Sequence, residues 1–189
     1  MPAFKYFGNM CPCCEKTTRY EKDCNCEPDR DSLQSLFALS AYSEQFRGII
    51  HSLKYRNKRS YARPLGNWLG TALKSSRYIT PDLITAIPLH KKREHERGYN
   101  QSYLLARHVA KVFDQPFSPT LVRIKDTISQ TSLTRQQRLL NTRDAFESLE
   151  NDFFGARILL VDDVYSTGST MREAASLLQR SGACVYGAV

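Results

Sequence analysis

The chain has 189 residues, 41% of them hydrophobic, and its 27 Lys and Arg against 19 Asp and Glu give a net charge of +8. This length suits one α/β domain with a small addition and is too short for two full domains. No apolar run approaches the roughly 20 residues that cross a bilayer, and the first residues lack the pattern of a secretory signal, so we expect a cytoplasmic protein.

The positive charge is uneven along the chain. Residues 90–143 hold most of the excess of Lys and Arg. Such a concentration favours a partner that carries many negative charges, although charged side chains also cover solvated helices in many proteins. The position of these side chains relative to a pocket has to decide between the two interpretations.

Five of the six cysteines lie between residues 11 and 26. In a cytosolic chain this cluster predicts a structural zinc site, because two close thiolate pairs supply four tetrahedral ligands. Segment 1–31 also has too few apolar residues to become ordered without a metal. Free thiols or a disulfide are the alternative, and Cys13 is a possible substitute for a neighbouring ligand. The predicted zinc ligands are Cys11, Cys14, Cys24 and Cys26.

A short strand and two helices are predicted next. The strand extends from Leu36 to Tyr42, and apolar residues at helical spacing then mark two helix faces. Pro64 is compatible with the first turn of the second helix. The two faces consist of Phe46, Ile49, Ile50 and Leu53, and of Leu65, Trp68, Leu69, Ala72 and Leu73. Three side chains near the other edge of the first helix are interpreted as a solvated flank: His51, Lys54 and Tyr55.

From residue 80 the pattern alternates between strands and helices, which favours a parallel sheet with crossover helices. Strands are predicted over 83–87, 117–124, 157–161 and 183–189, and a helix over 98–113. A last helix, with an apolar face at helical spacing, is expected to end at Gly182. Cys184, in the final strand, is predicted to be a small core residue. The apolar face of the last helix consists of Met171, Ala174, Ala175 and Leu178.

Two adjacent carboxylates, Asp162 and Asp163, come directly after the predicted buried strand over 157–161. In open α/β sheets, ligands bind beyond the carboxyl ends of the strands. Neighbouring carboxylates repel each other and are costly to desolvate, so their presence favours a site that binds a cation or hydroxyl groups. Ribose hydroxyls and Mg²⁺ both meet this description.

A polar loop follows the doublet and runs into the last predicted helix. Its members are Ser166, Thr167, Gly168, Ser169 and Thr170. The unpaired N–H groups and the dipole of a helix start favour a phosphate, so one turn offers acceptors to a sugar and donors to its phosphate. A capping box formed by Thr170 and Glu173 is a simpler interpretation, but it would not require the doublet. The P-loop pattern of nucleoside triphosphate sites is absent.

Residues 158–170 resemble the phosphoribosyl pyrophosphate (PRPP) signature of type I phosphoribosyltransferases. Residues 86–90, 97–101 and 130–146 further resemble the ComF family, bacterial proteins linked to natural competence. Together with the N-terminal cysteines, the resemblance covers essentially the whole chain. The chain departs from the family at Ser166, where threonine is usual, and in the short spacing of its second cysteine pair.

This resemblance implies a type I phosphoribosyltransferase-like α/β fold, a parallel sheet flanked by helices, with a small N-terminal zinc-binding ribbon. The expected domains are a ribbon over 1–31 and a phosphoribosyltransferase-like domain over 32–189. Within the second, an N-terminal strand and helices occupy 32–79, and the PRPP-binding core occupies 80–189.

The resemblance also implies roles for individual residues. The turn over 88–90 corresponds to the pyrophosphate loop and residues 125–143 to a flexible loop. Arg97 and a flexible-loop cation, Arg135 or Arg138, would stabilise the departing pyrophosphate together with Mg²⁺; a surface pairing with Glu94 or Glu96 is the alternative for Arg97. The expected catalytic residues are Asp162, Asp163 and Arg97. The expected PRPP-binding residues are Leu89, His90, Asp162, Asp163, Val164, Tyr165, Ser166, Thr167, Gly168, Ser169 and Thr170.

Two functions remain open from the sequence. One is a phosphoribosyltransferase with an unknown acceptor. The other is a non-catalytic module that senses PRPP or a nucleotide and binds single-stranded DNA or a protein. The family resemblance implies a role in handling single-stranded DNA during transformation, with competence proteins such as a helicase or translocase as possible partners.

Overall fold

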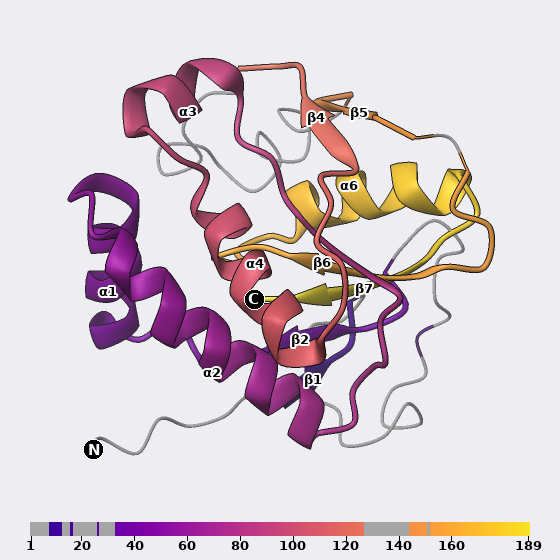
Figure 1. Ribbon diagram of the computed structural model, residues 1–189, viewed down its shortest axis with the longest axis horizontal. Coiled ribbons are helices and arrows are strands. Elements are labelled where there is room, and N and C mark those ends of the chain that lie inside the picture. The colour runs from indigo at the N-terminus through magenta and orange to yellow at the C-terminus, as the bar shows by residue number, and fades with distance from the viewer. Residues whose placement is uncertain (1–7, 13–15, 17–25, 27–32, 127–143, 151) are drawn as a thin grey trace.

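A five-stranded sheet forms the centre of the computed structural model, which describes residues 8–12, 16, 26, 33–126, 144–150 and 152–189 (Figure 1). The strand order is β1-β2-β7-β6-β3. Neighbouring strands are parallel except for β1, which pairs antiparallel with β2 and so joins part of the N-terminal segment to this sheet. The strands are β1 (Gly8–Met10), β2 (Leu36–Ala38), β3 (Leu83–Ala86), β6 (Arg157–Val161) and β7 (Cys184–Ala188).

The aliphatic run of β6 explains why layers form on both sides of the sheet. Its side chains alternate between the two faces, and all four from Ile158 to Val161 are completely buried. Leu159 and Val161 belong to a core packed with helices, whereas Ile158 and Leu160 belong to a second core on the opposite face. Both faces of β6 therefore need a covering layer.

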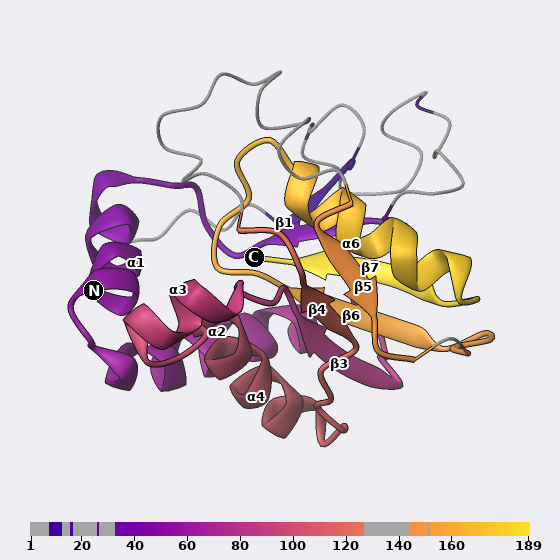
Figure 2. The same ribbon diagram turned by 90° about the horizontal axis from the view of Figure 1, so that it is seen from above.

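Helices α1 (Glu44–Tyr55), α2 (Ala62–Ser75) and α4 (Gln101–Phe113) cover one face, with a 3-10 turn, η2 (Arg59–Tyr61), between the first two. Their apolar stripes supply the first core. On the other face lies α6 (Ser169–Arg180), together with a two-stranded antiparallel sheet of β4 (Leu121–Arg123) and β5 (Phe146–Ser148). Figure 2 shows these two layers on either side of the main sheet.

The structure confirms most of the predicted elements with shorter bounds. The strand over 157–161 is found as predicted, and the apolar faces of α1, α2 and α6 are buried. The strand predicted from Leu36 to Tyr42 ends at Ala38, and the one predicted over 117–124 is limited to β4, outside the main sheet. Strand β5 was not predicted, because three residues are too few to show an alternating pattern.

The start of one predicted helix and the burial of one cysteine differ from the prediction. The helix predicted over 98–113 begins only at Gln101, because Gly98 ends a separate short helix, α3 (Lys91–Arg97), in the left-handed conformation at φ 79°. Helix α3 consists of charged residues without an apolar face, so its sequence carries no amphipathic signal. Cys184 was expected in the core, but it lies exposed at the first position of β7. Among the described helices, none is both long enough and apolar enough to cross a membrane.

Candidate functional site

The turn between β6 and α6 borders a cavity of about 350 Å³ at the carboxyl end of the sheet. Residues 162–171 form one wall, and side chains from α1, α3, α4, β4 and the turn before α3 form the others. Strands β3 and β6 are neighbours and parallel, so the segments that follow them meet at this edge. The structure thus brings the predicted acidic doublet, the polar loop, Leu89 and Arg97 to one cavity.

Asp162 accepts two hydrogen bonds on Oδ1. One comes from the hydroxyl of Ser102 and the other from the backbone N–H of Asp163, each at 2.8 Å. Burial, and after it the negative charge of Asp163, raise the pKa of Asp162 to about 7, although Lys54 and the two donors act in the opposite direction. The carboxyl group of Asp162 therefore holds a proton more readily than an exposed aspartate does.

Ser102 is positioned by the start of α4. The Asn100 side chain caps this helix by accepting from the N–H groups of Ser102 and Tyr103, and its amide donates to the carbonyl of Ile87 at 3.0 Å. Asn100 is almost completely buried. The Asn100 side chain therefore joins Ile87, which follows β3, to the start of α4, the helix that contacts the doublet.

Asp163 pairs with Lys54, a residue that was interpreted as part of a solvated flank. The ammonium Nζ of Lys54 lies 2.7 Å from Oδ2 of Asp163, and only 4% of the Asp163 side chain is exposed. Burial alone would lower the pKa of Lys54, but the carboxylates of Asp163 and Asp162 outweigh it, so the pKa is raised. The flank interpretation is wrong for Lys54. Tyr55 is exposed, as expected of a flank residue, and it also lines the same cavity.

Arg172 organises the loop before α6 from within that helix. Its Nη2 donates to the carbonyl of Thr167 at 2.6 Å and its Nη1 to the hydroxyl of Tyr165 at 3.2 Å. Gly168 lies beneath them with φ 69°, and a Cβ there would lie 2.1 Å from the Tyr165 hydroxyl. The loop thus needs glycine both for its backbone conformation and for space.

The start of α6 has no side-chain cap. Gly168 occupies the N-cap position, and Glu173 accepts instead from the backbone N–H of Asp144 at 2.9 Å. The capping-box interpretation of Thr170 and Glu173 is therefore wrong. The first N–H groups of α6 therefore have no side-chain acceptor at the N-cap, and binding of a phosphate there stays a prediction.

Three arginines from two elements, α3 and β4, line the cavity. Arg97 donates to Oε1 of Gln101 at 2.5 Å, and its guanidinium lies 5.2 Å from the centre of the Tyr55 ring. Within the described residues it pairs with neither Glu94 nor Glu96. Arg93 and Arg123 also line the cavity, and burial lowers the pKa of Arg123. His90 is the N-cap residue of α3. Its Nδ1 lies 3.9 Å from Oδ1 of Asp126, and the residue is not part of the cavity wall.

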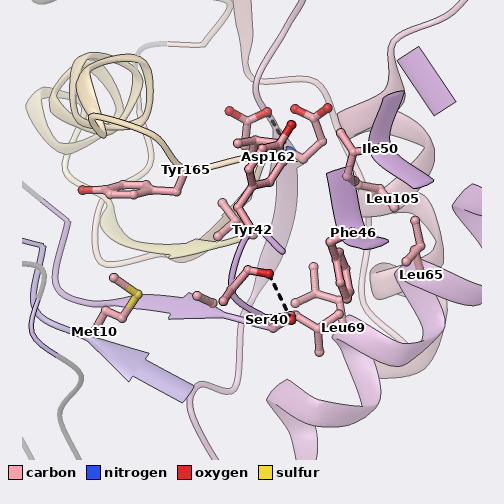
Figure 3. Close-up of a pocket in the computed structure, with 16 residues that line it drawn as sticks. Met10, Ser40, Tyr42, Phe46, Ile50, Leu65, Leu69, Leu105, Asp162 and Tyr165 are labelled. Atoms are coloured by element: carbon pink, nitrogen blue, oxygen red, sulfur yellow. Dashed lines mark hydrogen bonds between the residues drawn. The ribbon is translucent and has the colours of Figure 1, made fainter. Parts of the chain in front are cut away.

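A second, apolar cavity of about 260 Å³ lies on the other side of the doublet. Figure 3 shows Phe46, Ile50, Leu65 and Leu69 facing it from α1 and α2, with Asp162 at its rim. Asp162, Asp163, Val164 and Tyr165 line both cavities. Apolar surroundings on this side contribute to the burial that disfavours the charged form of Asp162.

The doublet fits the expected Mg²⁺. Carboxylate oxygens are the ligands that this ion prefers, and the ammonium of Lys54 already occupies a cation position beside Asp163. Asp162, Asp163 and the hydroxyls of a bound sugar would hold the ion there. Within the described ranges, no group of three or more His, Cys, Asp and Glu suits a metal.

The predicted zinc ligands lie largely outside the described residues. Of the four, only Cys11, which is buried after β1, and Cys26, which is partly buried, are described, whereas Cys14 and Cys24 are not. Arg135 and Arg138 of the expected flexible loop also lie outside the described part of the chain. The zinc site and the flexible loop therefore stay predictions.

Comparison with known proteins identifies the family. Residues 100–189 match the model of the phosphoribosyl transferase domain. Competence protein F of Haemophilus influenzae is 31% identical over 188 residues, which cover 95% of this chain and 81% of the relative. The chain belongs to the ComF family. DNA utilization protein YhgH of Escherichia coli K12 is 30% identical, with 97% of this chain and 89% of the relative covered.

More distant relatives and solved structures extend the comparison. Competence protein ComFC of Bacillus subtilis is 28% identical over 94% of this chain and 75% of the relative. Glutamine PRPP amidotransferase from B. subtilis matches with a TM-score of 0.49 and 18% identity, covering 73% of this chain and 30% of that one. Adenine phosphoribosyltransferase from Leishmania donovani matches with a TM-score of 0.47 and 13% identity, and the match covers 87% of this chain and 73% of that one. The type I phosphoribosyltransferase-like fold of this ComF chain rests on the domain match and on the parallel sheet.

Several site residues of this ComF protein were not predicted: Lys54, Ser102, Arg123 and Arg172. Each contacts or lines the site from an element whose position depends on tertiary packing. One signal was available for Lys54, because it follows Ile50 by four residues and so lies at the border of the buried face of α1. The sequence offered no comparable signal for Arg123.

Proposed function

We propose that the cavity at the carboxyl end of the sheet binds PRPP with Mg²⁺. The observation that carries the proposal is the junction of β6 and α6, where one turn presents two largely buried carboxylates and an uncapped helix start to the same cavity. This combination suits a ligand with hydroxyl groups at one end and a phosphate at the other. It suits a bare nucleobase poorly.

In this proposal, Asp162 and Asp163 bind the ribose hydroxyls and the loop over 166–170 binds the 5′-phosphate. Arg97 lies on the side where the pyrophosphate would extend, with Leu89 in the neighbouring turn. Mg²⁺ would supply positive charge to the pyrophosphate and the sugar. The protein's part is to orient the ligand and to stabilise the negative charge that grows as the bond between C1 and the pyrophosphate oxygen breaks.

Calorimetric titration of PRPP in the presence of Mg²⁺ tests the site. We expect Asp162→Asn and Asp163→Asn each to reduce the affinity at least roughly tenfold, since each removes a charged hydrogen-bond acceptor from the ligand. Asp152→Asn changes the net charge equally on an exposed turn and should leave the affinity unchanged. Unchanged affinity in both doublet variants, with the fold intact, would refute the site.

Whether PRPP is only bound or also consumed depends on an acceptor. No side chain of the cavity needs to act as the nucleophile, because the attacking atom would come from the second substrate, and pyrophosphate would leave with both electrons of the broken bond. Release of pyrophosphate in the presence of candidate bases and nucleotides measures this. Binding without release for every acceptor would favour the sensing module.

We further propose that the protein acts in the uptake or use of DNA in the cytoplasm, as the names of its relatives suggest. A groove of about 500 Å³ continues from the doublet cavity and shares Lys54, Tyr55, Arg93 and Arg97 with it. The Tyr55 side chain is exposed beside these cations. Basic side chains with an aromatic ring are suited to single-stranded DNA, which a helicase or translocase of the competence system would deliver.

The salt dependence of binding to single-stranded DNA tests this second function. Arg97→Ala should lower the slope of log affinity against log salt by about one, and Tyr55→Ala should weaken binding without changing the slope. Arg180→Ala removes the same charge from the exposed last turn of α6 and serves as control. If Arg97→Ala and Arg180→Ala give the same slope as the wild-type protein, the DNA does not lie in this groove.

A further inference from the structure

Lys54 reaches the doublet from a helix that the phosphoribosyltransferase domain match does not include, since that match begins at residue 100. Its ammonium lies 2.7 Å from Asp163, and 23% of the Lys54 side chain is exposed. The same side chain lines both the doublet cavity and the adjoining groove. It therefore stands between the two anionic side chains and the surface on which a polyanion would lie.

The two carboxylates differ in how they are satisfied. Asp162 accepts from Ser102 and from a backbone N–H. Within the part of the chain that the structure describes, Lys54 is the polar partner of the Asp163 side chain. A carboxylate that is almost completely buried needs a compensating positive charge, and Lys54 provides it.

The backbone that carries Lys54 is fixed by contacts beyond the doublet. The hydroxyl of Tyr99 donates to the carbonyl of Leu53, and Nη2 of Arg59 donates to the carbonyl of Gly98 at 3.2 Å. These contacts hold the last turn of α1 and the following turn η2 against the segment that leads into α4. The long side chain can still turn, and the groove contains Arg93 and Arg97, which would attract the same anion as Lys54.

We propose that Lys54 is a built-in counter-cation that keeps a free divalent ion away from the doublet until PRPP arrives, so that metal and sugar phosphate bind together. This inference rests on the proposed PRPP site. A metal ion alone must displace the Lys54 ammonium from Asp163, and the ammonium is then left without a partner. A metal ion that arrives with PRPP brings a pyrophosphate, to which the released ammonium turns, so the displacement is compensated. Metal and ligand are then coupled reciprocally.

Binding of Mn²⁺ without PRPP, measured by electron paramagnetic resonance on the full chain, tests the first half of the proposal. We expect Lys54→Met to bind Mn²⁺ roughly tenfold or more tightly than the wild-type protein, because the competing charge is gone. Lys58→Met makes the same change of charge at an exposed position just beyond α1 and should behave as the wild type. Adding Asp163→Asn to Lys54→Met should abolish the gain, which assigns the new binding to the doublet.

The second half is tested by repeating the titration with PRPP. In the wild-type protein PRPP should tighten Mn²⁺ binding, and in Lys54→Met this coupling factor should fall roughly tenfold. Lys54→Gln is a second neutral variant should the methionine variant unfold, and Lys54→Arg should retain wild-type behaviour. Equal Mn²⁺ affinity in Lys54→Met, Lys58→Met and the wild type would overturn the inference. A wild-type protein that binds no PRPP would refute the proposed function instead. The Mn²⁺ affinities without PRPP would still decide whether Lys54 competes with a metal ion for the doublet.

Discussion

The hydroxyl of Ser102 donates to the carboxylate of Asp162 across 60 residues of sequence. This bond joins the first turn of α4, which comes after β3 and α3 in the chain, to the residue that follows β6, the parallel neighbour of β3. The doublet is therefore held by the start of a helix as well as by its own turn.

Asp162 should make the stability of the metal-free protein depend on pH. Its pKa rises from 3.8 to about 7 on folding, so between these values the folded protein binds more protons than the unfolded chain. Stability contributed by this group is therefore highest below its unfolded pKa and is lost as the pH rises toward the folded one. We expect the free energy of unfolding of the wild type, relative to Asp162→Asn, to fall over this range in urea titrations.

A second variant checks the cause of this dependence. The Ser102 hydroxyl favours the charged form of Asp162, so Ser102→Ala should raise the folded pKa further and extend the loss of stability to higher pH. Parallel stability curves for the wild type and Asp162→Asn would show that the carboxyl titrates as it does in the unfolded chain.

Asn100→Ala should destabilise the fold by about 2 kcal/mol, because it removes the cap of α4 and leaves the buried carbonyl of Ile87 without its donor. Ser43 caps α1 through a single, longer bond of 3.4 Å to the N–H of Phe46. Ser43→Ala should therefore cost only about 0.5–1 kcal/mol. Thermal and denaturant unfolding measure both values, and an equal effect of the two substitutions would contradict the double role of Asn100.

Gly168→Ala should weaken PRPP binding roughly tenfold or more, because the new Cβ displaces the Tyr165 hydroxyl and with it a contact of Arg172, which holds the loop. Gly155 has a similar φ of 73° but nothing within 4 Å of a Cβ. Gly155→Ala should thus reproduce the backbone strain, about 1 kcal/mol of stability, with unchanged affinity. Calorimetry on both variants separates the effect of backbone strain from that of the new Cβ against Tyr165. Equal PRPP affinities of Gly168→Ala and Gly155→Ala would show that the loop tolerates a displaced Tyr165.

Elemental analysis of the purified protein should find about one zinc per chain, held by the predicted set of Cys11, Cys14, Cys24 and Cys26. Cys24→Ser should lose this zinc and lower the melting temperature. Cys184→Ser should retain it, since Cys184 lies exposed on β7. A protein that contains no zinc and unfolds at the same temperature with or without a chelator would exclude the site.

The sequence predicted those parts of the site that follow one another along the chain. The aliphatic run of β6, the doublet, the polar loop and the apolar face of α6 form one continuous segment, whose pattern is local. The wrong predictions share a different cause. Helix α3 has no buried residues and so no apolar face that a pattern could reveal, and the burial of Cys184, at the first position of β7, depends on how that end of the strand is packed.

By itself the sequence determined the fold class, the doublet at a strand end and the polar loop before the last helix, because burial pattern, charge and turn chemistry are properties of neighbouring residues. Only the tertiary structure decided that Lys54 neutralises Asp163, that Ser102 holds Asp162 and that Arg172 holds the loop. Helical spacing places Lys54 at the edge of a buried face without saying what lies opposite. That partner is fixed by how α1 packs against the sheet, and packing is decided by the whole chain at once.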